Sequence, residues 1–293
     1  MESNYYYLFS SLPELTFNEK TDYRELYYLF EESMEILAEE DKISMTYVRY
    51  PIDNANAIHL LEGREEKFMN GGNYSLKELK SEIETLDTLP LYMVQFLQMY
   101  KQFQAPFNNQ NLIDLLNEMF YSQVLKIIDS NFDRETSQES DFIKLWYGFE
   151  RDLKNVLTVQ ECNLHNISIE RRETFRLSQK KGQLLSGDYD ITNSLLHSKA
   201  YDYSLTGALT WMPSVLKLKS ENIEQYEKEI LMIKLDMLDE FTEGETFSLN
   251  LILSFFIKLQ LLIRWSSLDE VSGKNFIENL SGKAVAHAKH IFV

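Results

Sequence analysis

Three carboxylates that lie within about one helical turn of one another are the leading candidates for metal binding in this sequence. Asp236, Asp239 and Glu240 form the pattern Asp-x-x-Asp-Glu. On a helix, such a pattern can hold Mg²⁺ against a diphosphate, because hard cations prefer oxygen ligands. A second acidic motif that would face them is missing, and the predicted helix ends at Gly244. The pattern is interpreted first as a solvated acidic face, and a magnesium-dependent helical enzyme is kept as an alternative.

Two pairs of potential metal ligands are also present. Cys162 and His165 are three residues apart, but a structural zinc site needs four ligands. His287 and His290 share one helical face, and no third ligand can be assigned to them. We therefore expect an ordinary buried thiol at Cys162 and solvent-exposed histidines near the C-terminus.

Motifs for nucleotide binding or acyl transfer are absent from the sequence. Gly71-Gly72 precedes a capped helix and predicts a turn, there is no Gly-x-Ser-x-Gly elbow, and the single cysteine lies in no nucleophile motif. The sequence thus predicts no catalytic residue, no cofactor and no metal.

A cluster of basic residues is the candidate surface for docking a partner. In a chain of net charge −17, this cluster is either a local docking patch or a solvated helix. Its members are Arg171, Arg172, Arg176, Lys180 and Lys181.

Charge restricts the classes of partner. The chain carries 46 acidic and 29 basic residues, and its pI is near 4.8. Such a surface repels phosphate backbones and anionic lipids, so we expect no nucleic acid and no direct membrane insertion; a basic protein surface is favoured. One cysteine cannot form an internal disulfide, which indicates a reducing compartment. No signal peptide is visible at the N-terminus, and polar residues interrupt the apolar stretch 249–263, which predicts a buried helix in a soluble protein.

The elements that position these residues are predicted to be helices. The 293 residues contain only ten glycines and five prolines, about 5% of the chain, whereas ordinary proteins carry about 12% of the two together. Apolar residues recur at spacings of three and four, Ser75 and Glu78 form a capping box, and Pro90 opens a new helix. The sequence predicts an all-α protein with helices near residues 22–37, 76–86, 91–103, 111–127, 141–156, 222–241 and 247–266, and a short piece around 276–280.

Three segments depart from this pattern. Residues 5–13 are rich in aromatics and have strand propensity, but no partner strand is nearby, so an extended or helical segment packed on the core is expected. Residues 43–50 are a second β-like candidate, too isolated to build a sheet. Residues 167–203 are the least periodic part and are expected to be irregular.

Three stretches of sequence carry a resemblance to a known family. They are Tyr5 to Leu15, Trp146 to Asn155, and Phe247 to Trp265. Together they resemble a bacterial family known as domain of unknown function 2764. Genes of that family typically stand among those of a vacuolar-type rotary ATPase, in the place of the stalk subunit that is lettered C (d in eukaryotes). This C-type stalk subunit is an all-helical, funnel-shaped protein of three similar domains that seats the rotor shaft on the membrane ring.

Within the second stretch, Glu150-x-x-Leu153-x-Asn155 is similar to the recurring acidic-then-Asn-Leu helices of the C-type stalk subunit. Asp53-x-x-Asn56 echoes Asp152-x-x-Asn155 elsewhere in the chain. The motifs that carry the resemblance are packing motifs, so their residues are expected to be structural. These residues are Trp146, Phe149, Leu153, Asn155 and Trp265.

The resemblance implies a non-catalytic central-stalk subunit of a V/A-type rotary ATPase, which couples the rotor shaft to the membrane ring during ion transport or ATP synthesis. Its partners would be those shaft and ring subunits, and it would be cytoplasmic and peripherally attached to the inner membrane. We expect three helical units, at residues 1–106, 107–203 and 204–293. A general helical scaffold, or an enzyme using Asp236, Asp239 and Glu240, remains the alternative.

Overall fold

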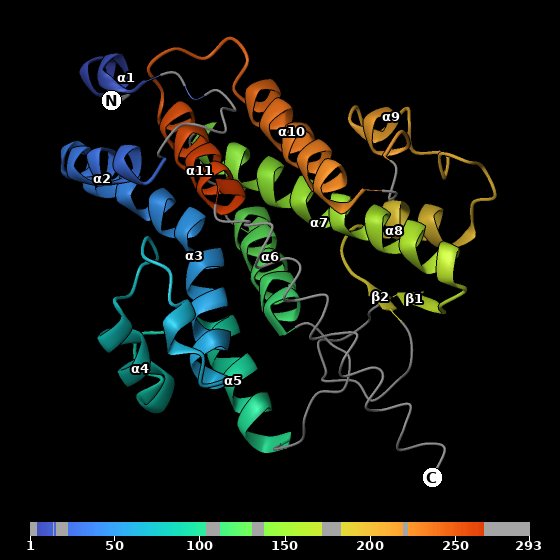
Figure 1. Cartoon of the computed structure of the whole chain (residues 1–293), viewed down its shortest axis with the longest axis horizontal. Coiled ribbons are helices and arrows are strands. Elements are labelled where there is room, and N and C mark those ends of the chain that lie inside the picture. Colours follow the sequence, from blue (N-terminus) through green and yellow to red (C-terminus); the bar gives the residue numbers. More distant parts are fainter. Residues whose placement is uncertain are drawn as a thin grey trace. The chain divides into compact units, whose positions relative to one another are not determined.

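The computed structural model describes residues 5–13, 15, 23–103, 112–130, 138–171, 183–218 and 222–266. Within these residues the chain is predominantly helical, and its one sheet has two short strands (Figure 1). The all-α prediction is confirmed. It follows from the scarcity of glycine and proline and from the long runs of helical periodicity.

The chain forms two compact units. The first unit comprises residues 1–37 and 245–293, and the second comprises residues 38–244. The first unit therefore contains residues from both ends of the sequence. A division of the chain into consecutive segments does not predict such a unit. The three consecutive units expected from the sequence remain a prediction.

The first unit packs the N-terminal helices against the last long helix. Tyr27 and Phe30 bring their rings against Phe255 and Phe256 of that helix, with the Phe30 and Phe255 rings stacked at 5.3 Å between centroids. Within residues 5–13, which had strand propensity, Tyr6–Ser11 form a short helix, and the N–H of Tyr5 just before it donates to the carbonyl of Phe247. The described elements of this unit are α1 (Tyr6–Ser11), α2 (Tyr23–Ser33), the 3-10 helix η1 (Met34–Ile36) and α11 (Leu249–Ser266).

Helix α11 is the one helix in the described part of the chain that is long and apolar enough to cross a membrane. Just over half of it, 56%, is buried inside the protein. Core helices pass the same test of length and composition, and α11 packs against α2 within the first unit.

The second unit contains the remaining described elements. They are α3 (Glu39–Leu61), η2 (Glu65–Lys67), α4 (Leu76–Thr85), α5 (Leu91–Phe103), α6 (Leu112–Ser130), α7 (Gln138–His165), β1 (Ile169–Arg171), β2 (Gln183–Leu185), α8 (Tyr189–His197), α9 (Met212–Val215) and α10 (Ile223–Phe241). Helix α6 packs against α3, α5 and α7, and α10 lies against α7 (Figure 1).

Aromatic side chains fill the centre of this second unit. The ring of Phe120 on α6 contacts Tyr50 of α3, Tyr92 of α5 and Tyr147 of α7, at centroid distances of 5.5, 5.3 and 4.9 Å. The hydroxyl of Tyr147 donates to the carbonyl of Tyr47 at 2.8 Å, which joins α7 to α3. These ring contacts, together with the hydrogen bonds of the Tyr147 and Tyr92 hydroxyls, hold the helices in one arrangement.

Helix ends lie where capping chemistry places them. Ser75 and Glu78 form the predicted capping box at the start of α4, and α5 begins directly after Pro90. Asn222 caps α10 by accepting a hydrogen bond from the backbone N–H of Gln225. Gly244, after the end of α10, adopts φ +80°, a conformation that favours glycine.

Two predictions about local structure are wrong. Residues 43–50 are helical and belong to α3, where Met45 and Val48 are buried against neighbouring helices, and no strand lies beside them in the described part of the chain. Residues 167–203 are not wholly irregular: β1 pairs in parallel with β2, with Ile169 opposite Gln183, and α8 follows. Strands of three residues are too short to show periodicity, and their pairing joins residues 14 positions apart.

Candidate functional site

The structure places the acidic triplet on an exposed surface of α10. Asp236, Asp239 and Glu240 are all exposed, and Glu240 accepts a hydrogen bond from the Thr210 hydroxyl at 3.2 Å. Among the described residues, no three or more His, Cys, Asp or Glu side chains are grouped closely enough to hold a metal ion. The triplet therefore has the geometry of a solvated acidic face.

The other candidate ligands are also apart. Cys162 is buried, and burial raises the pKa of its thiol, with a smaller contribution from Glu161. His165 is exposed and pairs with Glu161 at 2.9 Å. His287 and His290 lie outside the described residues. Of the basic cluster, Arg171 ends strand β1, whereas Arg172, Arg176, Lys180 and Lys181 lie outside the described residues.

Four of the five residues predicted to be structural are buried on α7. Trp146, Phe149, Leu153 and Asn155 are each at most 5% exposed. The ring of Phe149 contacts Trp146, and also Trp211 and Phe241 at centroid distances of 5.4 and 6.2 Å. Trp265, near the end of α11 in the first unit, is partly exposed.

A network of hydrogen bonds in the second unit is centred on Asp53 and Asn56 of α3, which are both fully buried. Asn56 clasps the backbone of Met69: its Nδ2 donates to the Met69 carbonyl, and its Oδ1 accepts from the Met69 N–H, both at 2.8 Å. Asp53 accepts hydrogen bonds from the backbone N–H groups of Asn73 and Tyr74 and from Asn73 Nδ2. These two side chains fasten the loop between α3 and α4 to α3.

Glycine at position 72 is required for this contact. A Cβ built on Gly72 would overlap the Asp53 carboxylate, so the loop approaches α3 more closely than any other residue type allows. Burial raises the pKa of the Asp53 carboxyl to about 6, although its hydrogen bonds from Asn73 and Tyr74 and the charge of Arg49 lower it. The predicted turn at Gly71-Gly72 is confirmed, and its role is to receive Asp53.

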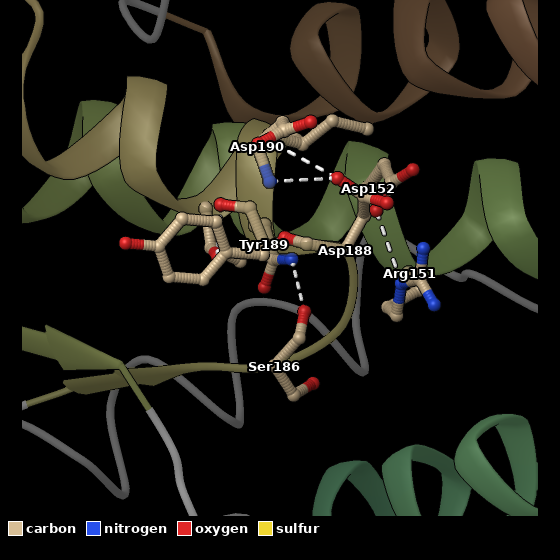
Figure 2. A network of polar contacts seen from close by, with 9 residues as sticks. Arg151, Asp152, Ser186, Asp188, Tyr189 and Asp190 are labelled. Atoms are coloured by element: carbon tan, nitrogen blue, oxygen red, sulfur yellow. Dashed lines mark hydrogen bonds and ion pairs between the residues drawn. The ribbon is translucent and has the colours of Figure 1, made fainter.

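A second arrangement of the same kind lies between α7 and α8 (Figure 2). Asn155 Nδ2 donates to the carbonyl of Ser186 at 2.7 Å, and both residues are buried. Asp152 is buried beside Arg151, whose Nε lies 3.0 Å from Asp152 Oδ1. Asp188 caps α8 by accepting from the backbone N–H groups of Asp190 and Ile191.

In this second arrangement, as in the first, a glycine allows the loop to approach the helix closely and a buried carboxyl has a raised pKa. Gly187 has φ +110°, and a Cβ there would overlap the Arg151 guanidinium. Burial raises the pKa of the Asp152 carboxyl and the nearby Asp188 raises it further, whereas Arg151 lowers it. The guanidinium thus compensates part of the cost of a buried carboxylate.

The two arrangements occupy equivalent places on their helices. Asn56 and Asn155 each lie 17 positions after the first residue of α3 and of α7. In each case an Asp three residues earlier is buried, the Asn binds backbone of a later loop, and a glycine in that loop precedes a helix capped by a side chain. We call these residue pairs the two anchors. The Asp-x-x-Asn echo in the sequence was the signal for them, but it did not reveal which loops they bind.

Chemically, the anchors hold backbone in place. The two amides and the Asp53 carboxylate form hydrogen bonds to loops of the same chain, whereas the Asp152 carboxylate pairs with Arg151 of its own helix. These contacts fix where α4 and α8 begin relative to α3 and α7. Asn54, next to Asp53, extends the first anchor: it donates to Asn117 of α6 and accepts from the hydroxyl of Tyr92 of α5. This is the chemistry of a rigid framework.

Comparison with known proteins gives one match. A family model described as "Protein of unknown function (DUF2764)" matches residues 1–284. No curated protein and no solved structure matches the chain.

Proposed function

The chain belongs to the DUF2764 family, and we propose that it is a non-catalytic central-stalk subunit of a V/A-type rotary ATPase. In this role it joins the rotor shaft to the membrane ring during ATP-driven ion transport or ATP synthesis. It is cytoplasmic and is held at the inner membrane through its protein partners.

The observation that carries the proposal is the pair of anchors. The C-type stalk subunit, which the sequence resembles, has recurring helices in which an acidic residue is followed by Asn. Here Asp53 with Asn56, and Asp152 with Asn155, are buried at the same register of two long helices, and in both pairs the Asn donates to a backbone carbonyl of a later loop. A repeated helical unit of this kind supports a place in that structural class.

Two physical properties of the chain favour the same role. A coupler between two partners must transmit force with little internal deformation, and α3 and α7 are 23 and 28 residues long, with buried polar contacts fixing the loops that follow them. A net charge of −17 favours contact with basic protein surfaces over anionic lipid.

Copurification tests the proposal. The chain, tagged at one terminus in its native cells, is isolated in mild detergent, and the recovered proteins are identified by mass spectrometry. The proposal predicts that rotor-shaft and membrane-ring subunits are recovered together and in fixed ratio. Recovery of an unrelated protein set would favour a general scaffold, and recovery of neither shaft nor ring would refute the stalk assignment.

A further inference from the structure

The loop that the first anchor holds contains the pair Asn70-Gly71, which forms a turn. No other asparagine in the sequence is followed by glycine. Asparagine followed by glycine is a common turn sequence, and asparagine is also one of the chemically labile residues of proteins. Whether this pair reacts therefore depends on how the loop holds it.

The loop is fixed to α3 on both sides of this pair. Asn56 makes two hydrogen bonds to the backbone of Met69 at 2.8 Å, and Asp53 accepts one from the backbone N–H of Asn73 at 3.0 Å. Gly72, between these two points, lies against the Asp53 carboxylate. The turn at residues 70–71 thus lies between two fixed points of the backbone.

Asn70 and Gly71 themselves are held by no polar contact. Asn70 is exposed, and neither its side-chain amide nor the N–H of Gly71 forms a hydrogen bond with the residues that the structure describes. Gly71 has no Cβ to hinder an approach to its nitrogen. By contrast, the side chain of Asn73 donates to the Thr46 carbonyl and to Asp53. Of the two asparagines in this loop, Asn70 is therefore the one whose amide can meet the nitrogen of the next residue.

We propose that Asn70 is a site of covalent self-modification in the folded chain, where its side chain closes a succinimide ring onto Gly71 and the ring opens to isoaspartate or aspartate. The Gly71 nitrogen gives its proton to the solvent and bonds to Asn70 Cγ, and the bond from Cγ to Nδ2 breaks to release ammonia. Water then adds to the ring, at the backbone carbonyl to give isoaspartate or at Cγ to give aspartate. The sum consumes water and releases ammonia, and the neighbouring positions of the two groups favour the ring closure.

Isoaspartate alters the first anchor. Its main chain runs through the former side chain, which adds a methylene group to the backbone between Met69 and Asn73, the two points that α3 fixes. It also adds a carboxylate close in sequence to the backbone that the Asp53 carboxylate binds. Both changes loosen the loop. The inference goes beyond the proposed function, because it concerns the covalent state of one loop and holds for any complex that the chain joins.

Ageing of the purified full chain tests the inference. The folded chain is kept at neutral pH, and samples taken over successive days are digested with trypsin, which releases residues 68–77 between Lys67 and Lys77. Mass spectrometry with electron-transfer fragmentation should show isoaspartate and aspartate accumulating at Asn70, with Asn73 unchanged in the same peptide. The variant Asn70→Gln should lose the modification, because glutamine must close a larger ring, and its circular dichroism should be unchanged, because position 70 is exposed.

A synthetic peptide of residues 68–77 gives the reactivity of the pair without the fold. An Asn70 that stays intact in the folded chain while this peptide is converted would overturn the inference. Conversion to aspartate without isoaspartate would also overturn it, because that product indicates direct hydrolysis. The modified chain, separated by ion exchange as a more acidic species, should melt at a lower temperature than the unmodified chain; equal melting temperatures would overturn the loosening of the first anchor.

Discussion

At the scale of single residues, buried polar side chains of α3 form hydrogen bonds with the backbone of a loop and hold that loop in place. Asn56 makes both of its hydrogen bonds to one residue, Met69, and Asp53 accepts three from the next part of the same loop. Buried groups of this kind are costly when they are unpaired, so each is expected to matter for stability. None of them faces a cluster of metal ligands in the described part of the chain.

Asp53 should give the stability of the protein a specific dependence on pH. Its carboxyl has a pKa of about 6 in the folded chain, above its ordinary value of 3.8, so the folded state binds this proton more tightly than the unfolded state does. Lowering the pH from 7 to 4 should therefore stabilise the unmodified chain relative to Asp53→Asn, by up to about 3 kcal/mol. Urea unfolding of both proteins at each pH measures this difference.

The control for this pH effect is Asp236→Asn, at an exposed carboxyl of α10. Its free energy of unfolding should stay within about 0.5 kcal/mol of that of the unmodified chain, because the substituted side chain is exposed. If the Asp53→Asn and Asp236→Asn proteins showed the same pH dependence, the burial of Asp53 would not have the energetic consequence described.

Asn56→Ala should destabilise the protein by about 2–4 kcal/mol. The change leaves both the N–H and the carbonyl of Met69 without the partner they have in α3. Asn193→Ala, at an exposed position of α8, should change the free energy of unfolding by no more than about 0.5 kcal/mol. Chemical denaturation gives both values, and a similar small cost for both substitutions would contradict the role assigned to Asn56.

At the scale of elements, the two anchors determine where the following helices begin. Each anchor pairs a long helix, α3 or α7, with a loop whose glycine lies against it and with a capped helix, α4 or α8. A close approach of loop to helix is possible only without a Cβ, so glycine in these loops and glycine inside a helix have different roles.

Two substitutions to alanine separate these roles of glycine. Gly72→Ala should destabilise the protein by about 1–3 kcal/mol, because the new Cβ overlaps an Asp53 carboxylate that three hydrogen bonds hold in place. Gly148→Ala, inside α7 with no atom within 4 Å of the new Cβ, should stabilise it by about 0.5–1 kcal/mol. Thermal melts compare the two, and effects of the same sign would contradict this account of the loop.

Local sequence signals predicted the elements whose causes are local. The capping box at Ser75 and Glu78 and the helix after Pro90 depend on residues within one turn, and both are confirmed. The β-like residues 43–50 were misread because propensity alone ignores the helical neighbours that bury α3. The contact of Asp53 with Asn73 spans 20 positions and that of Asn155 with Ser186 spans 31, so the sequence could show the Asp-x-x-Asn pairs but not their loops.

At the scale of the whole molecule, the chain is an acidic helical framework made of two units, one of which joins its two ends. Family membership identifies its relatives, and the repeated anchors support the structural class proposed for it.

The most direct test of the stalk assignment is electron cryomicroscopy of the rotary ATPase purified from the native cells. The account predicts density for this chain between the rotor shaft and the membrane ring, with α3 and α7 recognisable as its long helices. An intact rotary ATPase in which another protein occupies that position, and from which this chain is absent, would contradict it.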